Sequence, residues 1–379
     1  MSSTYFNLAT ESDNEELLRF LHNNPMPGRV SVALERNPNF FFGAGIEGET
    51  HQTLVARTTD QNRIMAVGSR SVRMMWVDGQ QRSIGYLGQL RIDHEFRSRG
   101  KFIIHGYQHM HELHDNMQKT ESRADFYIST IVSDNKTAMR ILGNNVKGMP
   151  KYRRYGELSS FLLPIGPRLS SCSTTGRVNI RQAVQADLTS ILECLQRNNQ
   201  RFQFAPVWTR ENFSNPVRTH GLRVEDFILA EKAPGEICGV MALWDQTAFK
   251  QTVICGYSNV MDGMAKISRK LGELFHTPSL PKVGGAIPFA FVSHVAVDQD
   301  NQEVFLQLLS RMRQIARLRE ISFLTLGFAD KHPFNLAIRN LLLKVEYRST
   351  IFTVCWEDGA QAVAGIDSQR IPHLELAIL

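Results

Sequence analysis

The chain has 379 residues, of which 42% are hydrophobic and 21% charged, and its formal net charge is +6. A length of this order favours two globular domains, each long enough to bury a core without metals or disulfides. The positive charge suits a phosphate-bearing ligand, but the sequence has no dense Lys/Arg stripe, and we therefore expect no nucleic-acid partner.

The first residues, MSSTYFNLATESDNEELL, lack the basic and then apolar pattern of a signal peptide, and no apolar run is long enough to span a bilayer. The five cysteines all lie beyond residue 165, are odd in number and form no CxxC pair. Free thiols in a reducing compartment are the simplest interpretation. We therefore expect a cytoplasmic protein without a membrane partner, and its oligomeric state stays open.

The first half begins with a strand, a turn and an amphipathic helix in FNLATESDNEELLRFL, residues 6–21, where Asp13 is placed to cap the helix. Residues 51–59 and 63–77 alternate like adjacent antiparallel strands. GYLGQLRID, residues 85–93, predicts a strand that leads into a helix. The elements therefore begin as an antiparallel sheet with one long helix to follow.

The helix expected over Lys101–Met117 has one apolar face, drawn through Ile103, Gly106 and Met110, that must pack on the sheet. A buried strand and a short helix follow, and then the β-rich YGELSSFLLPI. A strand–helix–strand unit inside an otherwise antiparallel sheet indicates a mixed α/β (α+β) fold.

The pattern breaks at PIGPRLSSCSTTG, which has no periodicity and predicts a linker at 166–176. The order of elements then repeats, from VNIRQAVQADLTSILECL to STIFTVCWED. The simplest interpretation is two copies of one unit, with domains at 1–165 and 177–379.

The most informative stretch is LGQLRIDHEFRSRGKFIIHGY, in which a strand ends at Asp93 and a basic turn precedes a helix. The turn is Arg97-Ser98-Arg99-Gly100-Lys101. A helix N-terminus exposes backbone N–H groups and the positive end of its dipole, and glycine allows a close approach, so the turn predicts a phosphate site.

This stretch resembles the GNAT superfamily of acyl-CoA N-acyltransferases, whose signature is Gln/Arg-x-x-Gly-x-Gly/Ala at the start of the third helix. Arg97 and Gly100 match the first and fourth positions, whereas Phe102 departs from the sixth. Asn135 falls where the family places an Asn that meets the pantetheine arm. The resemblance covers most of 6–164 and implies two tandem GNAT-like domains, each a mixed, mostly antiparallel sheet flanked by helices.

The resemblance implies coenzyme A, as acetyl-CoA, for the co-substrate and a small-molecule or peptide amine for the acceptor. It places the pantetheine against the backbone of Leu90, Arg91 and Ile92, and the pyrophosphate against Arg97, Ser98, Arg99, Gly100, Lys101 and Phe102. The backbone N–H of Ile92 would hold the oxyanion. The second half replaces the loop by VAVDQDNQEVF, whose carboxylates repel phosphate, and we interpret it as a degenerate copy.

Catalysis is less well determined by the sequence. Many GNAT enzymes carry an acidic Tyr at the position of Leu142, and the nearest hydroxyl here is that of Tyr152, which we propose as the acid. A strand-face aromatic is the alternative interpretation of Tyr152, and no base can be named. Several histidines crowd residues 105–114, but no HExxH motif is present and we expect no metal.

Direct transfer of an acetyl group to a primary amine is the leading hypothesis, because the first half has no cysteine nucleophile. Two alternatives stay open. A non-catalytic CoA-binding sensor or scaffold is compatible with the missing Tyr at position 142. An aminoacyl transferase like the Fem enzymes should carry a long helical arm or a basic groove, and neither is evident.

Overall fold

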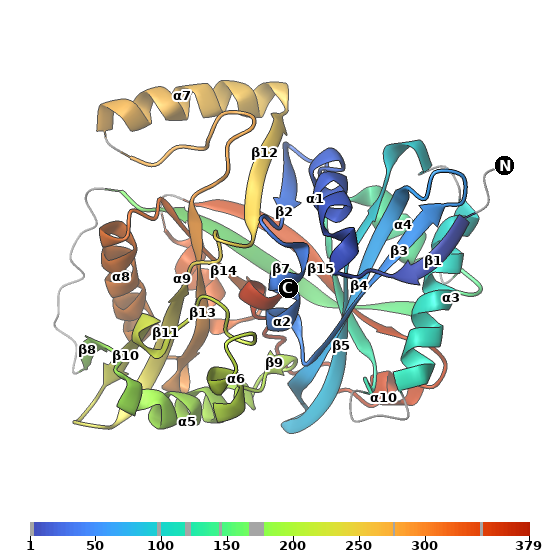
Figure 1. The fold of residues 1–379 in the computed structure, drawn as a ribbon. Helices are drawn as coiled ribbons and strands as arrows, with labels where there is room; N and C mark the ends of the chain where they lie inside the picture. The colour runs from blue at the N-terminus through green and yellow to red at the C-terminus, as the bar shows by residue number, and fades with distance from the viewer. Residues whose placement is uncertain are drawn as a thin grey trace.

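Two sets of strands and helices, one from each half of the chain, build the molecule (Figure 1). The computed structural model describes residues 4–96, 100–117, 123–143, 146–166, 178–275, 277–341 and 344–379. The strands are β1 (Thr4–Leu8), β2 (Val30–Glu35), β3 (Thr50–Thr58), β4 (Ile64–Val77), β5 (Gln80–Ile92), β6 (Tyr127–Val132), β7 (Lys151–Pro164), β8 (Asn179–Gln182), β9 (Ala205–Pro206), β10 (Phe227–Glu231), β11 (Ile237–Trp244), β12 (Gln251–Tyr257), β13 (Phe289–Val297), β14 (Phe323–Ala329) and β15 (Val345–Cys355). The α-helices are α1 (Asn14–Asn23), α2 (Ala44–Glu47), α3 (Gly100–Met117), α4 (Lys136–Gly143), α5 (Leu188–Asn199), α6 (Arg210–Ser214), α7 (Asn259–Phe275), α8 (Gln302–Leu318), α9 (Pro333–Arg339) and α10 (Ala360–Ala364).

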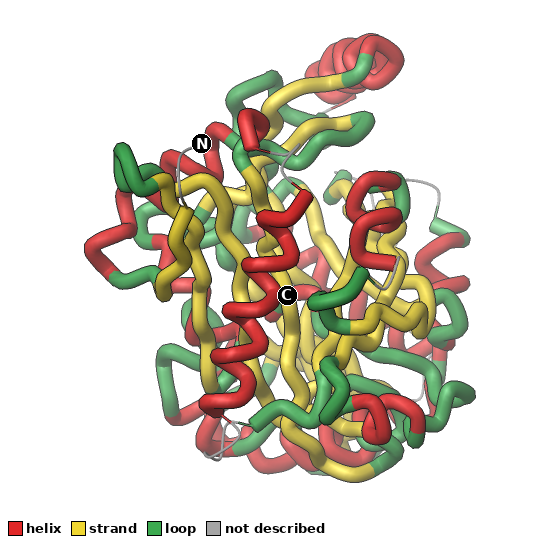
Figure 2. Tube along the Cα trace, turned by 90° about the vertical axis from the view of Figure 1, so that its right-hand side faces the viewer, coloured by secondary structure: helices red, strands yellow, loops and turns green. Residues whose placement is uncertain are grey.

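The strands of both halves join in one continuous sheet. Its order is β1-β3-β4-β5-β6-β15-β7-β14-β13-β11-β10-β8, and β9 pairs with β4. Within the described ranges, β5–β6 and β13–β14 are the parallel pairs, and the other neighbours are antiparallel. In Figure 2, which looks at the first half from its outer side, α3 lies along the strands. This is the mixed, mostly antiparallel α/β architecture that the sequence predicted.

The last strand of each half lies in the sheet of the other half. β15 is inserted between β6 and β7, where Val354 is opposite Tyr127 on one side and Tyr152 on the other. β7 in turn pairs with β14, where Leu163 is opposite Leu324. The two strands cross the middle of Figure 1 side by side. The repeat found in the sequence therefore does not correspond to two separate sheets.

The exchanged strands also carry core side chains into the opposite half. Phe161 and Leu163 of β7 are fully buried in the core around Phe305 of α8. Phe352 and Val354 of β15 are buried in the core beneath α3. Burying a large apolar side chain stabilises by roughly 1.5–3 kcal/mol, so the exchange joins the halves through their cores as well as their backbones.

The two halves repeat one irregularity as well as the order of elements. Gln89 in β5 and His294 in β13 both have left-handed backbones, with φ of 54° and 53°. Each stands four residues before the aspartate that ends its strand, Asp93 or Asp298. The strand pairing shifts register beside both positions. The expected linker at 166–176 lies, apart from Gly166, outside the described residues, and the division at 1–165 and 177–379 stays our proposal.

A second, two-stranded sheet connects the halves. β2 of the first half pairs with β12 of the second, from Glu35 opposite Gln251 to Val30 opposite Tyr257. β12 continues into α7, which stands at the upper edge of the molecule in Figure 1. None of the helices in the described ranges is long and apolar enough to cross a membrane.

Candidate functional site

The strands β5 and β6 separate shortly after they meet. Their parallel ladder pairs Gly85 with Tyr127 and Tyr86 with Ile128. Beyond that point β5 continues along β4 to Ile92, and β6 continues along β15 to Val132. A gap between diverging parallel strands gives an extended ligand two backbone edges to lie against.

Glycine is required where the two strands meet. A Cβ atom built on Gly85 would lie 2.1 Å from Cδ1 of Tyr127. The ring of Tyr127 thus packs directly on the β5 backbone, and its hydroxyl accepts a hydrogen bond from Nε of Arg70 at 2.6 Å. Close packing of Gly85 on Tyr127 thus holds the strands together where the gap begins. Farther along β5, the left-handed residue Gln89 bends the strand.

A cavity of about 460 Å³ opens at this gap. Six of the predicted site residues line it: Leu90, Arg91, Ile92, Phe102, Asn135 and Tyr152. The second half contributes to the wall through Lys250, Thr252 and Phe291, among others. The structure therefore brings residues predicted from separate segments of the first half to one place and closes that place with the second half.

The basic turn itself is only partly described. Arg97, Ser98 and Arg99 lie outside the described residues. Gly100 and Lys101 begin α3, and of Lys101 only the backbone is described. The helix N-terminus is therefore where the sequence predicted it. The role of these five residues in holding a pyrophosphate stays a prediction.

The departure at Phe102 has a structural explanation. Its ring is buried and stacks on Phe6 of β1 with a centroid distance of 5.4 Å. It belongs to a small core with Met65 and Phe96. The ring therefore points toward the sheet, as expected for a bulky residue that must leave the helix terminus open.

Asn135 is at the start of α4. Its Oδ1 accepts a hydrogen bond from the backbone N–H of Ala138 at 3.1 Å, which makes it the cap of that helix. Asn135 also lines the cavity. Its contact with pantetheine stays a prediction, and the capping bond gives it a structural role.

Tyr152 lies on the cavity wall, but its hydroxyl already has a partner. The hydroxyls of Tyr152 and Tyr107 are 2.7 Å apart, and both rings are buried. Burial raises the pKa of Tyr107 to about 12 and raises the pKa of Tyr152 well above its ordinary value. Both phenols are therefore neutral at physiological pH, and a proton is available on this pair. Sequence reasoning missed Tyr107.

A buried carboxylate forms the centre of a polar cluster that the sequence did not indicate. Glu47 of α2 forms an ion pair with Arg36, and its oxygens lie 3.4 Å from Nζ of Lys250 and 3.2 Å from Nδ1 of His51. Nε2 of Gln89, the left-handed residue of β5, donates to the same carboxylate at 3.3 Å. We call these five residues the Glu47 cluster.

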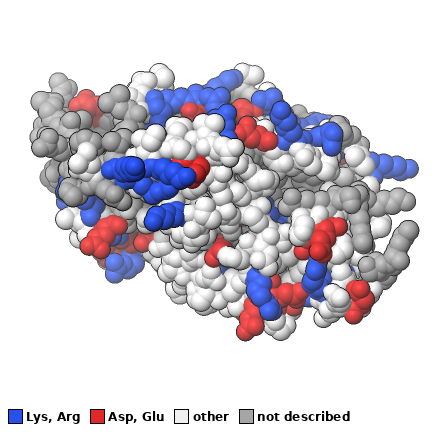
Figure 3. All heavy atoms as spheres, turned by 90° about the horizontal axis from the view of Figure 1, so that it is seen from above, with Lys and Arg blue, Asp and Glu red and all other residues white. Residues whose placement is uncertain are grey.

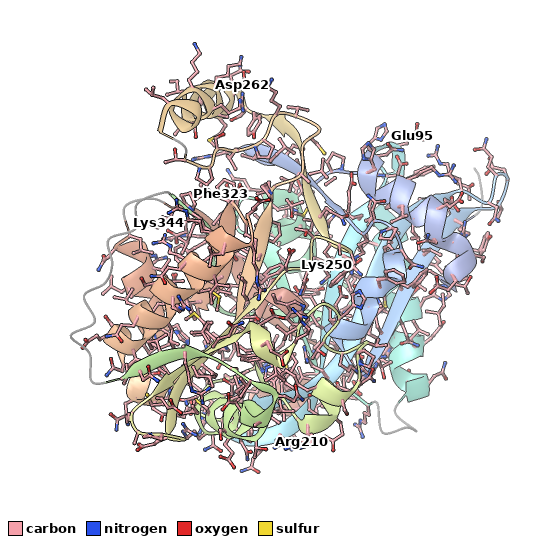
Figure 4. All side chains as sticks on the ribbon, turned by 60° about the vertical axis from the view of Figure 1, so that its left-hand side comes forward. Glu95, Arg210, Lys250, Asp262, Phe323 and Lys344 are labelled. Atoms are coloured by element: carbon pink, nitrogen blue, oxygen red, sulfur yellow. The ribbon has the colours of Figure 1, made fainter. Side chains whose placement is uncertain are left out.

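The charges of the Glu47 cluster are mutually dependent. Burial raises the pKa of Glu47, but the charges of Arg36 and Lys250 outweigh it and hold the pKa well below its ordinary value. Burial lowers the pKa of Lys250 to about 8, against the opposing effect of Glu47. Arg36, Glu47, Gln89 and Lys250 line the cavity, and Figure 4 labels Lys250 where the second half faces the first. The cluster therefore gives the cavity one charged end.

In the second half, the equivalent region is filled. Phe305 of α8 is seven residues after Asp298, as Gly100 is seven residues after Asp93. Its ring stacks on Phe334 with a centroid distance of 4.3 Å in the buried core. Asp298 and Asp300 of the equivalent turn form ion pairs with Arg197 and Arg201.

The histidines of α3 form no metal site within the described residues, where no group of His, Cys, Asp or Glu could hold an ion. They are also not all solvated. His114 is buried, with Nδ1 2.8 Å from the hydroxyl of Tyr127 and Nε2 2.8 Å from Asp358. His114 is therefore part of the core and not of a solvated helix face.

The fold resembles several solved structures. N-myristoyltransferase of Saccharomyces cerevisiae, solved with bound myristoyl-CoA, superposes with a TM-score of 0.60 at 11% identity, over 99% of this chain and 86% of that one. A GCN5-related N-acetyltransferase from Sphaerobacter thermophilus gives 0.57 at 11% identity, over 99% and 98% of the two chains. Another from Anabaena variabilis gives 0.51 at 11% identity, over 93% and 72%.

No protein-family model and no curated protein matches the sequence. The likeness to the solved structures extends over both halves, and the internal repeat is visible in the strand order and in the paired irregularities of β5 and β13. The chain therefore has the GNAT fold, the fold of the GCN5-related N-acetyltransferases, built twice in tandem.

Proposed function

We propose that this protein is an acyl-CoA-dependent N-acyltransferase whose donor binds the first half. The observation that carries the proposal is the cavity at the gap between β5 and β6. An acyl-CoA arm needs an extended groove that ends at a phosphate-binding helix terminus, and α3 begins at Gly100 beside this gap. The fold supports the proposal because GNAT proteins are built around the same parts.

The residues have the following proposed roles. The backbone of Leu90, Arg91 and Ile92 pairs with the pantetheine, with Asn135 on the opposite wall, and residues 97–102 hold the pyrophosphate. The acceptor amine attacks the thioester carbonyl, and the N–H of Ile92 stabilises the oxyanion. The C–S bond then breaks as the amide forms, and Tyr152 gives its proton to the leaving thiolate. The proton that the amine nitrogen loses passes through water to the Tyr152 oxygen, which restores the phenol.

The acceptor is a primary amine on a small molecule or a peptide in this proposal. It reaches the thioester from the end of the cavity that carries the Glu47 cluster, because that end has charged groups from both halves. The single carboxylate of Glu47 is balanced by Arg36 and Lys250, so it orients neighbouring groups and does not act as the base.

Acetyl is the acyl group that we propose first. A longer acyl chain is the second candidate, because apolar residues between α3 and the sheet, Tyr107 and Met110 of α3 and Leu54 of β3 among them, line the same cavity. These residues form an apolar wall between the helix and β3. An acetyl group would leave this space to water, whereas an alkyl chain would fill it.

One experiment tests the proposal and separates the donors. Thiol release is followed with acetyl-CoA and with acyl-CoAs of increasing chain length, against polyamines, aminoglycosides, amino acids and peptide N-termini. Release above the buffer rate with one donor class is the expected result. If no donor and acceptor pair releases thiol while calorimetry shows tight CoA binding, the protein is a non-catalytic CoA-binding sensor and not an enzyme.

Calorimetry with CoA also tests the location of the donor. We expect one site per chain, because Phe305 and its neighbours fill the equivalent region of the second half. The double variant Arg97→Ala, Arg99→Ala should weaken binding by about tenfold or more, since each charge-assisted hydrogen bond contributes roughly 1.5–3 kcal/mol. Two equal sites, or unchanged affinity in the variant, would contradict the assignment.

A further inference from the structure

The helix α7 exposes a continuous apolar stripe. Val260, Met264, Ile267 and Leu274 are 74%, 58%, 61% and 71% exposed. They are spaced four, three and seven residues apart, so they lie in one line along the helix. An exposed run of this kind is uncommon in a soluble protein and indicates an interaction surface.

The protein's own fold covers only part of the apolar side of α7. Ala265 is buried, and Met261 packs against the small core of β2 and β12. The stripe faces away from these contacts. In Figures 1 and 4 the helix stands off from the body of the molecule, with Asp262 at the top and Phe323 and Lys344 well below. The stripe is therefore presented outward.

Basic side chains border the stripe. Lys266 and Lys270 are exposed on α7, where Lys266 forms an ion pair with Asp262 at 2.6 Å. The loop that returns from the helix exposes Lys282 beside Val283, itself an exposed hydrophobic residue. Between residues 259 and 283 the sequence has four Lys or Arg and two Asp or Glu. Figure 3, which looks down on this end of the molecule, shows uncharged surface with both Lys or Arg and Asp or Glu side chains around it.

An apolar line of side chains with lysines beside it fits a lipid bilayer surface better than a second copy of α7. In a bilayer surface, the apolar side chains enter the boundary of the acyl chains while the lysines remain at the level of anionic headgroups. A second copy of α7 related by a two-fold axis would bring the lysines of both copies together, and like charges oppose such a contact. The charge pattern therefore favours lipid.

We propose that α7, with Lys282 and Val283, docks the protein on the surface of an anionic membrane. The sequence predicted no membrane partner because no apolar run is long enough to span a bilayer. A helix that lies on the membrane surface needs no such run. β12 connects α7 to the cavity, since Gln251 and Thr252 of that strand line it. Docking thus brings the charged end of the cavity to the side of the membrane. The inference does not depend on the proposed reaction.

Vesicle co-sedimentation of the full chain tests the inference. The probes are vesicles of phosphatidylcholine alone and of phosphatidylcholine mixed with phosphatidylserine. We expect binding to the mixed vesicles, weakened about tenfold or more in Met264→Glu, Ile267→Glu, because charges on the stripe oppose insertion. Lys266→Ala, Lys270→Ala should lose the preference for phosphatidylserine, since each basic residue near the surface contributes about 1 kcal/mol.

The matched control is Leu318→Glu, Leu336→Glu, which places the same charges on exposed leucines of α8 and α9. It should bind vesicles like the unmodified protein, and circular dichroism should show that all variants are folded. The inference is overturned if the unmodified protein binds neither kind of vesicle, or if Met264→Glu, Ile267→Glu binds the mixed vesicles as well as the control does. Size-exclusion chromatography could instead show a dimer that dissociates only in Met264→Glu, Ile267→Glu. Together with no vesicle binding, that result would identify a second copy of the chain as the occupant.

Discussion

The hydroxyl pair of Tyr152 and Tyr107 allows a sharp test of the proposed acid. Tyr152→Phe should reduce turnover by about 10²–10⁴-fold, the usual contribution of a placed proton donor, with the affinity for CoA largely kept. Tyr107→Phe removes the same hydrogen bond but leaves the proposed donor in place. It should therefore cost much less activity. Single-turnover thiol release measures both.

Equal losses of turnover in the two variants would mean that activity depends on the hydrogen bond between the tyrosines and not on Tyr152 as the proton donor. The free energy of unfolding should fall by about 1 kcal/mol in each variant, because each leaves one buried hydroxyl without its partner. Normal activity in Tyr152→Phe would exclude it as the acid, and the strand-face interpretation would then hold.

Glu375 predicts a dependence of stability on pH. It is buried and accepts hydrogen bonds from the backbone N–H groups of His294 and Ala377. Burial raises the pKa of Glu375 to about 7 against these bonds and the charge of Arg73. The folded state therefore binds more protons than the unfolded state from about pH 4.3 to 7, and the contribution of Glu375 is present below this window and lost as the pH rises through it.

The variant Glu375→Gln isolates this contribution, because the amide does not titrate. Its single oxygen can keep the hydrogen bond from His294, and the loss of the bond from Ala377 adds an offset that does not change with pH. The difference in free energy of unfolding, unmodified protein minus variant, should fall by up to about 1.4 kcal/mol for each pH unit inside the window. Urea titrations at several pH values measure it. A constant difference, or one that rises with pH, would show that Glu375 is ionised throughout.

Single residues also mark where sequence reasoning was adequate and where it was not. Leu90, Ile92 and Asn135 could be named from the sequence because the spacing of strand, turn and helix fixes them locally, and the three residues line one cavity. Tyr107 was missed because the apolar face of α3 was drawn through Ile103, Gly106 and Met110, and Tyr107 borders that line. The five residues of the Glu47 cluster come from distant segments, and in the sequence each resembles an ordinary surface residue.

At the scale of elements, the junction of β5 and β6 depends on Gly85. A Cβ atom there would overlap the Tyr127 ring, so Gly85→Ala must push the strands apart or displace the ring. We expect a loss of about 1–3 kcal/mol in stability, as for other overpacked sites, together with weaker CoA binding. Thermal unfolding and calorimetry measure the two effects.

Gly143, at the end of α4, provides the control for that prediction. A Cβ atom at Gly143 would meet no atom within 4 Å. Gly143→Ala should therefore leave both stability and CoA binding nearly unchanged. If Gly85→Ala behaves the same way, the ring of Tyr127 moves easily, and the junction does not set the width of the gap.

The order of elements could be predicted because each element has its own period and its own capping residues. The exchange of β7 and β15 could not. Both segments are β-rich in sequence, and either could close either half. Their pairing is decided by cores that form between residues far apart in the sequence, such as Phe161 with Phe305, and local periodicity carries no information about such contacts.

At the scale of the whole molecule, the exchange predicts that the first half cannot stand alone. A fragment of residues 1–166 would lack β15, which pairs with both β6 and β7. We expect it to be insoluble or unfolded and to bind no CoA. Co-expression with a fragment of residues 178–379 should restore a soluble complex, because the second fragment supplies β15 and accepts β7.

Circular dichroism and CoA binding of the separate and combined fragments measure this outcome. A folded 1–166 fragment that binds CoA would mean that β7 can take the place of β15 beside β6. The tandem GNAT fold itself was predicted correctly from the repeat of elements. What the repeat did not indicate is that neither copy is complete within its own stretch of chain.

The exchanged strand has a consequence for the protein while it is being synthesised. β6 ends at Val132, and its neighbour β15 begins only at Val345. At roughly 5–20 residues per second, a ribosome takes on the order of ten seconds or more between the two. Throughout that interval the edge of β6 that β15 will occupy stays unpaired, and an exposed strand edge of this kind is prone to pair with another chain and aggregate. The half that leaves the ribosome first is therefore completed only after nearly the whole chain has followed it.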